Sequence, residues 1–161
     1  MRREMEELVP RLQASLYRAA FAVCRDRQEA ENITQETFLA YFRTGMEFES
    51  DEHIRAWMLR VAINKAKDYC RSFWRRNRVD LDELALGIPF ETPEDSEVFK
   101  AVMALPRRQR TVIYLFYYEN RPIREIASLL RAREGTVKSL LHRGRMNLKT
   151  TLQEGWSHDE P

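Results

Sequence analysis

The fold of the C-terminal part of the chain is decided by residues 123–149, which read IREIASLLRAREGTVKSLLHRGRMNLK. Apolar residues recur there at helical spacing in two runs, separated by a short break over residues 131–135. The first run is Ile123, Ile126, Ala127 and Leu130, and the second is Val137, Leu141, Gly144 and Leu148. Two short helices joined by such a turn form a helix-turn-helix. An ordinary helical hairpin with a polar outer side fits the same spacing.

In a helix-turn-helix the second helix buries one side and shows the other to the major groove of DNA. Arg and Lys pair with guanine edges or phosphates, and Ser and Thr serve either purpose. We therefore predict DNA contact by the start and the outer side of this helix. The predicted residues are Arg133, Glu134, Thr136, Lys138, Ser139, His142 and Arg143.

The charges of the chain are segregated, although its net charge is only +2. Residues 51–79 carry 8 basic and 3 acidic side chains, and residues 100–149 carry 12 and 3. Residues 80–99 between them carry 7 acidic side chains and no basic one. Two basic blocks on one short chain suggest a polyanionic partner, while basic residues that merely solvate helix faces would give the same counts.

Helical spacing continues through most of the chain, so we expect an all-α fold of two small helical domains. We predict an N-terminal helical domain over residues 1–78, with helices at about 8–23, 29–43 and 52–78. Residues 79–96 contain Gly87, Pro89 and Pro93 and interrupt the spacing, so they are predicted to form a flexible acidic linker. The helix-turn-helix domain is placed at residues 97–152, with Pro106 in the first turn of a helix that runs to about Glu119, and a tail at 153–161.

The third predicted helix carries a basic side of its own. At 100° per residue, one face collects Arg60, Asn64, Lys67, Arg71, Arg75 and Arg78. The opposite side is mainly apolar, with Ile54, Met58, Val61, Ala62, Tyr69 and Phe73. Such a stripe is able to follow a nucleic-acid backbone. Trp57 lies at its edge, where it either stacks on a base or anchors the core.

Residues 105–149 resemble the C-terminal domain of the extracytoplasmic-function (ECF) group of bacterial sigma factors. The resemblance rests on the start at Leu105-Pro106 and on Gln109-Arg110, Glu125-Ile126-Ala127, Gly135-Thr136-Val137-Lys138-Ser139 and His142-Arg143. It implies that the last helix reads the −35 promoter element. Arg133 stands where the family often has a serine cap. Leu140 stands where an arginine is common, and it either meets a thymine methyl or packs internally.

The resemblance extends into the N-terminal half. Residues 30–43 are similar to the family segment that docks on RNA polymerase, which implies polymerase contacts by Asn32, Gln35, Glu36 and Phe38; the family usually has an acid at the first of these. Residues 56–78 resemble the promoter-melting segment, with matches at Trp57, Asn64, Asp68 and Arg71. The loop at residues 44–52 then takes the place of the family loop that holds a flipped −10 base. For −10 recognition and melting we predict Phe48, Trp57, Arg60, Asn64, Lys67 and Arg71.

The resemblance implies a sigma factor whose partners are core RNA polymerase, promoter DNA and an anti-sigma factor. Residues 1–7 are of mixed charge and lack the apolar core of a signal peptide, so we expect the protein in the cytoplasm. No enzyme motif, metal-ligand spacing, cofactor motif or run of 18 apolar residues occurs in the sequence, so we expect neither catalysis, metal, cofactor nor membrane insertion. Cys24 and Cys70 share no motif and are expected to be buried free thiols. Two alternatives are a stand-alone helix-turn-helix regulator acting as a dimer and an adaptor that binds an acidic protein. The regulator does not account for the second basic helix or for the segment at 30–43, and the adaptor differs from a DNA-binding protein in that DNA binding should weaken steeply with salt.

Overall fold

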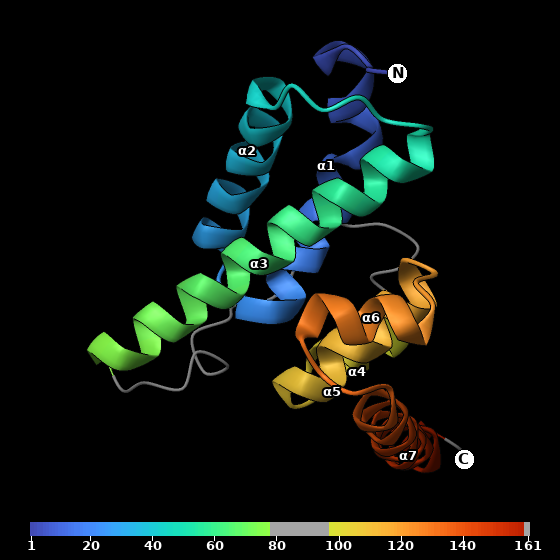
Figure 1. The fold of residues 1–161 in the computed structure, drawn as a ribbon. Coiled ribbons are helices and arrows are strands. Elements are labelled where there is room, and N and C mark those ends of the chain that lie inside the picture. Colours follow the sequence, from blue (N-terminus) through green and yellow to red (C-terminus); the bar gives the residue numbers. More distant parts are fainter. Residues whose placement is uncertain (78–96, 160–161) are drawn as a thin grey trace. The chain divides into compact units, whose positions relative to one another are not determined.

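A computed structural model describes residues 1–77 and 97–159 of the chain, and within them the side chains of residues 1–72 and 97–153. The described residues form α-helices and one π-helical turn and contain no strand, which confirms the all-α prediction (Figure 1). The chain divides into two compact units, one N-terminal and one C-terminal, that are each described by themselves. The predicted linker at 79–96 lies outside the described residues.

Over residues 1–77, the N-terminal unit has three helices: α1 (Met5–Cys24), α2 (Arg27–Arg43) and α3 (Asp51–Asn77). The first ends at Arg25, which has a φ of 49° and donates its N–H to the carbonyl of Phe21. A sharp turn follows, because the Asp26 side chain accepts the N–H of Glu29 at 3.0 Å and caps the next helix. Ser50 starts α3 in the same way by accepting the N–H of His53 at 3.1 Å.

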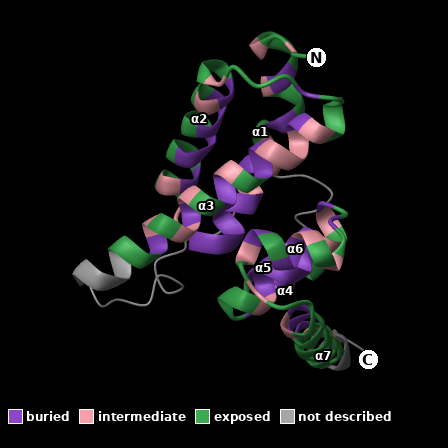
Figure 2. Ribbon diagram, viewed as in Figure 1, coloured by how far each residue is buried: buried purple, intermediate pink, exposed green. Residues whose placement is uncertain are grey.

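Each of these three helices packs on the other two, and their facing sides make the core (Figure 2). Leu8, Leu12 and Leu16 of α1 are buried together with most of residues 19–24. Cys24 and Cys70 are buried free thiols, as predicted. Burial raises the pKa of the Cys24 thiol to about 12, so it stays protonated at neutral pH.

Within residues 97–159, the C-terminal unit consists of four α-helices and a π-helical turn. They are α4 (Glu97–Met103), α5 (Arg107–Ile113), the π-helical turn η2 (Tyr114–Tyr118), α6 (Ile123–Leu130) and α7 (Glu134–Asp159). Pro106 precedes α5 and its carbonyl accepts the N–H of Arg110 at 2.9 Å. The single helix expected from Pro106 to Glu119 is therefore an α-helix that continues as a π-helical turn.

The connection from α6 to α7 is a three-residue turn, which confirms the helix-turn-helix. Arg131 closes α6 with a φ of 54°, and the N–H of Ala132 reaches back to the carbonyl of Ala127 at 2.9 Å. This pattern is a Schellman motif, although glycine is the usual residue at its left-handed position. The last helix then runs to Asp159, so most of the tail predicted at 153–161 is helical.

Gly144 allows α7 to lie close against α5. A Cβ added there would stand 2.8 Å from Cγ1 of the buried Ile113. Such a distance requires the neighbour to move, and overpacking of this kind typically costs about 1–3 kcal/mol. Glycine is therefore required at this point of the helix by packing, despite its poor helix propensity.

We expect Gly144→Ala to lower the free energy of unfolding by about 1–2 kcal/mol, because the packing cost exceeds the gain in helix propensity. Gly135→Ala is the matched control, since nothing lies within 4 Å of its added Cβ in the same helix. That control should be neutral or slightly stabilising. Thermal unfolding of both variants checks the prediction, and equal midpoints would show that α5 and α7 do not need the close approach.

Candidate nucleic-acid interface

The start and the outer side of α7 form the first candidate surface. Six of the seven residues predicted there are exposed and Thr136 is half-buried. The exposed six are Arg133, Glu134, Lys138, Ser139, His142 and Arg143. Val137, Leu141 and Gly144 are buried on the other side, as the periodicity predicted. Leu140, for which two placements were open, is buried and packs internally.

Buried polar contacts in and after α5 stabilise the unit that carries the helix-turn-helix. The Arg110 side chain is 0% exposed and donates to the carbonyl of Leu105 at 3.0 Å. Close by in sequence, the Tyr114 hydroxyl donates to the carboxylate of Glu119 at 2.7 Å, and Arg121 donates to the carbonyl of Glu119 at 2.8 Å. Arg121 also pairs with Glu125 of α6 at 3.5 Å. Two of the 12 basic residues counted between 100 and 149 thus serve the fold and are not available to DNA.

A second basic surface lies on α3. Arg60, Asn64 and Arg71 are exposed and Lys67 is half-buried, while Ile54 and Met58 on the opposite side are buried. Arg71 pairs with Asp68 on the surface. From the first to the last of these exposed residues the stripe extends about 16 Å at 1.5 Å per residue. Arg78 and the side chains of Phe73 and Arg75 lie outside the described residues.

The loop between α2 and α3 lies at one end of this stripe and is held by an aromatic cluster. Phe48 is 2% exposed and its ring stacks on Tyr41, with 5.5 Å between centroids. It also meets His53 and Trp57 edge to face, at 5.0 and 5.7 Å. The predicted contact between Phe48 and DNA therefore needs correction, because the Phe48 side chain is buried. Its ring anchors the loop by packing against side chains of α2 and α3. Trp57 is half-buried: it packs on Phe48 and keeps part of its surface accessible.

The exposed face of α2 is a third surface, and its character is mixed. Asn32, Gln35 and Glu36 are exposed as predicted, and Glu36 pairs with Lys65 of α3 at 3.4 Å. Phe38 is only 6% exposed, so it belongs to the core and cannot meet a partner directly. The family resemblance implied that Phe38 is a contact residue, whereas its spacing from the buried Thr34, Thr37 and Tyr41 places it on the inner side of the helix.

Two residues of this face were missed by the sequence reasoning. Leu39 is 47% exposed and Phe42 is 69% exposed, both unusual for large apolar side chains. They follow Gln35 at the four- and seven-residue spacing that places side chains on one face of a helix. That spacing was available in the sequence and would have identified them. Together with Gln35 and Glu36 they form an apolar and acidic stripe, here called the α2 stripe.

Comparison with known proteins assigns both units. A family model described as "Sigma-70 region 2" matches residues 8–76, and one described as "Sigma-70, region 4" matches residues 96–148. The ECF RNA polymerase sigma factor SigL of Mycobacterium tuberculosis is 34% identical over 150 residues, which cover 88% of this chain and 84% of SigL. The chain belongs to the ECF group of RNA polymerase sigma factors. Proteins of this group direct RNA polymerase to promoters and are not enzymes.

Two further likenesses agree with this assignment. The ECF sigma factor SigE of Mycolicibacterium smegmatis is 29% identical over 160 residues, and the match spans 91% of this chain but 61% of SigE. The solved structure of the sigma factor RpoE from Bartonella quintana, in complex with the anti-sigma factor NepR, matches with a TM-score of 0.71. At 20% identity, over 92% of this chain and 96% of RpoE, that match shows a common fold.

The family match to residues 8–76 decides against a stand-alone regulator, which has no need of a sigma region 2. None of the helices in residues 1–77 and 97–159 is both long and apolar enough to cross a membrane. Over the same residues, no group of three His, Cys, Asp or Glu side chains is placed to hold a metal ion.

Proposed function

We propose that this sigma factor divides its work among the three surfaces described above. The α2 stripe binds core RNA polymerase, the basic face of α3 with its preceding loop binds and melts the −10 element, and the outer side of α7 reads the −35 element. The single observation that carries this proposal is the exposure of two basic helical faces in two separate units of a sigma factor. Promoter binding places the protein where the polymerase acts, in the cytoplasm.

Melting of the −10 element must be driven by binding energy, because the sequence contains no motif for nucleotide hydrolysis. A base that leaves the DNA stack costs a few kcal/mol, which must be recovered in a protein pocket. The basic residues Arg60, Lys67 and Arg71 attract the backbone of the separating strands, and Asn64 presents an amide to a base edge. Trp57 offers an accessible part of its ring for stacking.

An anti-sigma factor is the remaining proposed partner. The solved relative RpoE is bound to the anti-sigma factor NepR, and this chain shares its fold. The half-exposed Leu39 and the mostly exposed Phe42 place apolar surface in water and are suited to an apolar partner surface. An anti-sigma factor that covers them would prevent the polymerase from binding at the same place.

Transcription from a library of genomic fragments tests the function. With purified bacterial core RNA polymerase and this protein, we expect new RNA 5′ ends that share two upstream elements, one near −10 and one near −35. Sequencing of the 5′ ends with and without the protein measures this. Identical 5′ ends in the two reactions would contradict the proposed function, even if the protein bound DNA.

The recognition helix gives a second prediction. Arg143→Ala should weaken binding of the holoenzyme to DNA that carries the −35 element by roughly 1–3 kcal/mol, the value of one good base contact. Affinity for core polymerase should not change. Arg145→Ala is the matched control, because it removes the same charge from α7 while its guanidinium lies over the Phe116 and Tyr117 rings. If the two variants lose equal affinity, net charge and not a specific contact explains the effect.

The α2 stripe gives a third prediction. Phe42→Ala should lower affinity for core polymerase by at least about tenfold, because large aromatic side chains dominate such interfaces. The folding stability should hardly change, since this ring is mostly exposed. Met146→Ala serves as control, because it truncates another half-exposed apolar side chain, in the C-terminal unit. Competition binding against labelled wild-type protein checks this, and unchanged affinity of Phe42→Ala would remove α2 from the polymerase interface.

A further inference from the structure

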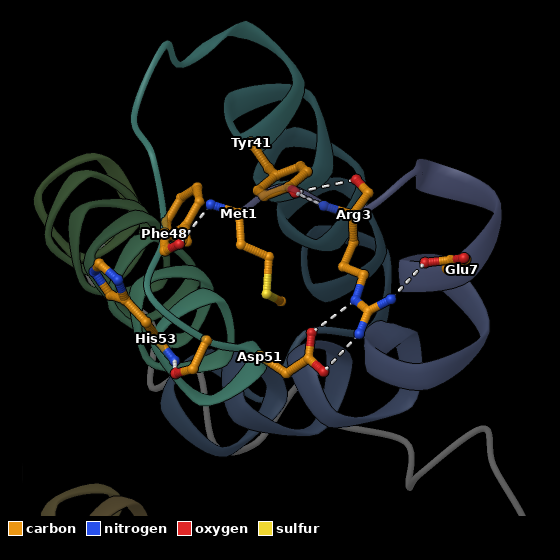
Figure 3. A network of polar contacts seen from close by, with 8 residues as sticks. Met1, Arg3, Glu7, Tyr41, Phe48, Asp51 and His53 are labelled. Carbon is orange, nitrogen blue, oxygen red and sulfur yellow. Dashed lines mark hydrogen bonds and ion pairs between the residues drawn. The ribbon is translucent and has the colours of Figure 1, made fainter.

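The residues before α1 lie against the loop that joins α2 and α3 (Figure 3). The backbone N–H of Phe48 donates to the carbonyl of Met1 at 3.2 Å, and the amino group of Met1 donates to the carbonyl of Phe48 at 2.7 Å. Met1 and Phe48 of the loop are therefore joined by two hydrogen bonds between their backbones, and the Phe48 ring is buried.

Arg2 joins the loop to the end of α2. Its guanidinium donates to the carbonyl of Met46 at 2.9 Å and to the carbonyl of Tyr41 at 2.8 Å, and it lies 4.7 Å from the centre of the Tyr41 ring. Tyr41 is in the last turn of α2, where carbonyl groups lack partners within the helix and carry partial negative charge. A guanidinium is well matched to that position, because its planar fork donates to two acceptors at once.

Arg3 joins α2 to the first residue of α3. Its guanidinium makes two hydrogen bonds to the Asp51 carboxylate, at 3.0 and 3.2 Å, and a longer contact of 3.4 Å to Glu7 in the first turn of α1. Its backbone N–H donates to the Tyr41 hydroxyl at 2.7 Å, and that hydroxyl donates back to the Arg3 carbonyl at 3.0 Å. The hydrogen bonds from Arg3 also lower the pKa of the Asp51 carboxyl, so this pair stays charged in neutral solution.

The two arginines thus bind both ends of the loop. Arg2 contacts Tyr41 at the end of α2, and Arg3 contacts Asp51 at the start of α3. Between these points the loop exposes Met46, Glu47 and Glu49, while Phe48 is fixed underneath. Ion pairs this exposed contribute little to overall stability, because water and salt screen them. Their effect is therefore on the shape of the loop and not on the existence of the fold, which depends on the helix core.

We propose that Arg2 and Arg3 are positioning residues that set the −10 base preference of this sigma factor by holding the loop in its base-capturing shape. The inference rests on the proposed function, in which this loop captures a flipped base. A loop that is ordered before binding does not have to be ordered at the moment of capture, so the correct base gains affinity. A loosened loop adapts to several bases and discriminates less among them.

Promoter selection with the reconstituted holoenzyme tests the proposal. The library carries a fixed −35 element and a randomised −10 element, and any purification tag is placed at the C-terminus. Wild-type protein should enrich one base strongly at the captured position. Arg2→Ala, Arg3→Ala and Asp51→Ala should each reduce that enrichment by about 2- to 12-fold, the change expected when one more side chain must be ordered on binding.

The matched control separates the loop contact from the rest of the Arg3 side chain. Glu7→Ala removes the contact between Arg3 and α1 but leaves the pair with Asp51, so its base enrichment should equal that of wild type. Arg3→Lys keeps the charge without the two-pronged geometry and should restore part of the enrichment. The double variant Arg3→Ala with Asp51→Ala should lose no more than either single variant, because both remove the same interaction.

Three results would overturn the inference. Arg3→Ala with wild-type enrichment would show that the loop does not need its anchor. Equal losses at every position, accompanied by weaker −35 binding and a lower unfolding midpoint, would show a general stabilising role. A wild-type holoenzyme that enriches no base would refute the proposed function itself, and this failure is recognised because it precedes any substitution.

Discussion

The burial of one side of α3 between α1 and α2 is the constraint on which the N-terminal unit depends. Ile54, Met58, Ala62 and Ala66 are fully buried, whereas Arg60 and Asn64 between them are exposed. Because side chains repeat every 3.6 residues, burial of the apolar face fixes the direction of the polar face. Packing of the apolar face is therefore sufficient to direct the basic stripe toward solvent. A rotation of α3 about its axis would bury charged side chains, which is unfavourable in free energy.

The same periodicity explains how much the sequence could reveal. The helices, the helix-turn-helix and the outward sides of α3 and α7 follow from apolar spacing, and the structure has all of them. The predictions failed where the family resemblance was carried over without regard to spacing or burial. Phe38 was taken as a contact residue from its place in the polymerase-docking segment and Phe48 from its place in the base-holding loop, yet both are buried. The loop has no period at all, so only three-dimensional contacts could reveal that Phe48 is enclosed by Tyr41, His53 and Trp57.

The distribution of charge along the sequence indicated where basic surfaces lie, but not which single basic residues are exposed. The segregation of basic residues correctly indicated two exposed basic faces, yet Arg110 and Arg121 are buried under the helix-turn-helix. A buried guanidinium is tolerated only where carbonyl or carboxylate groups accept its N–H groups. The carbonyl of Leu105, just before α5, accepts from Arg110, and Arg121 is paired with the carbonyl of Glu119 and the carboxylate of Glu125. The sequence contains these groups, but composition predicts neither the pairing of Arg121 with Glu125 nor the π-helical turn that precedes them.

The α2 stripe and the basic face of α3 are held relative to each other by contacts between the two helices that lie outside both surfaces. Asp26 caps α2 through the N–H of Glu29 and also accepts the hydroxyl of Tyr69 from α3 at 2.7 Å. That bond and desolvation raise the pKa of the tyrosine, so it remains a donor at neutral pH. One carboxylate therefore fixes both the start of the helix that bears the α2 stripe and the position of the helix that bears the basic face. A partner that moved α2 away from α3 would have to break this hydrogen bond, so the bond couples the positions of the two surfaces.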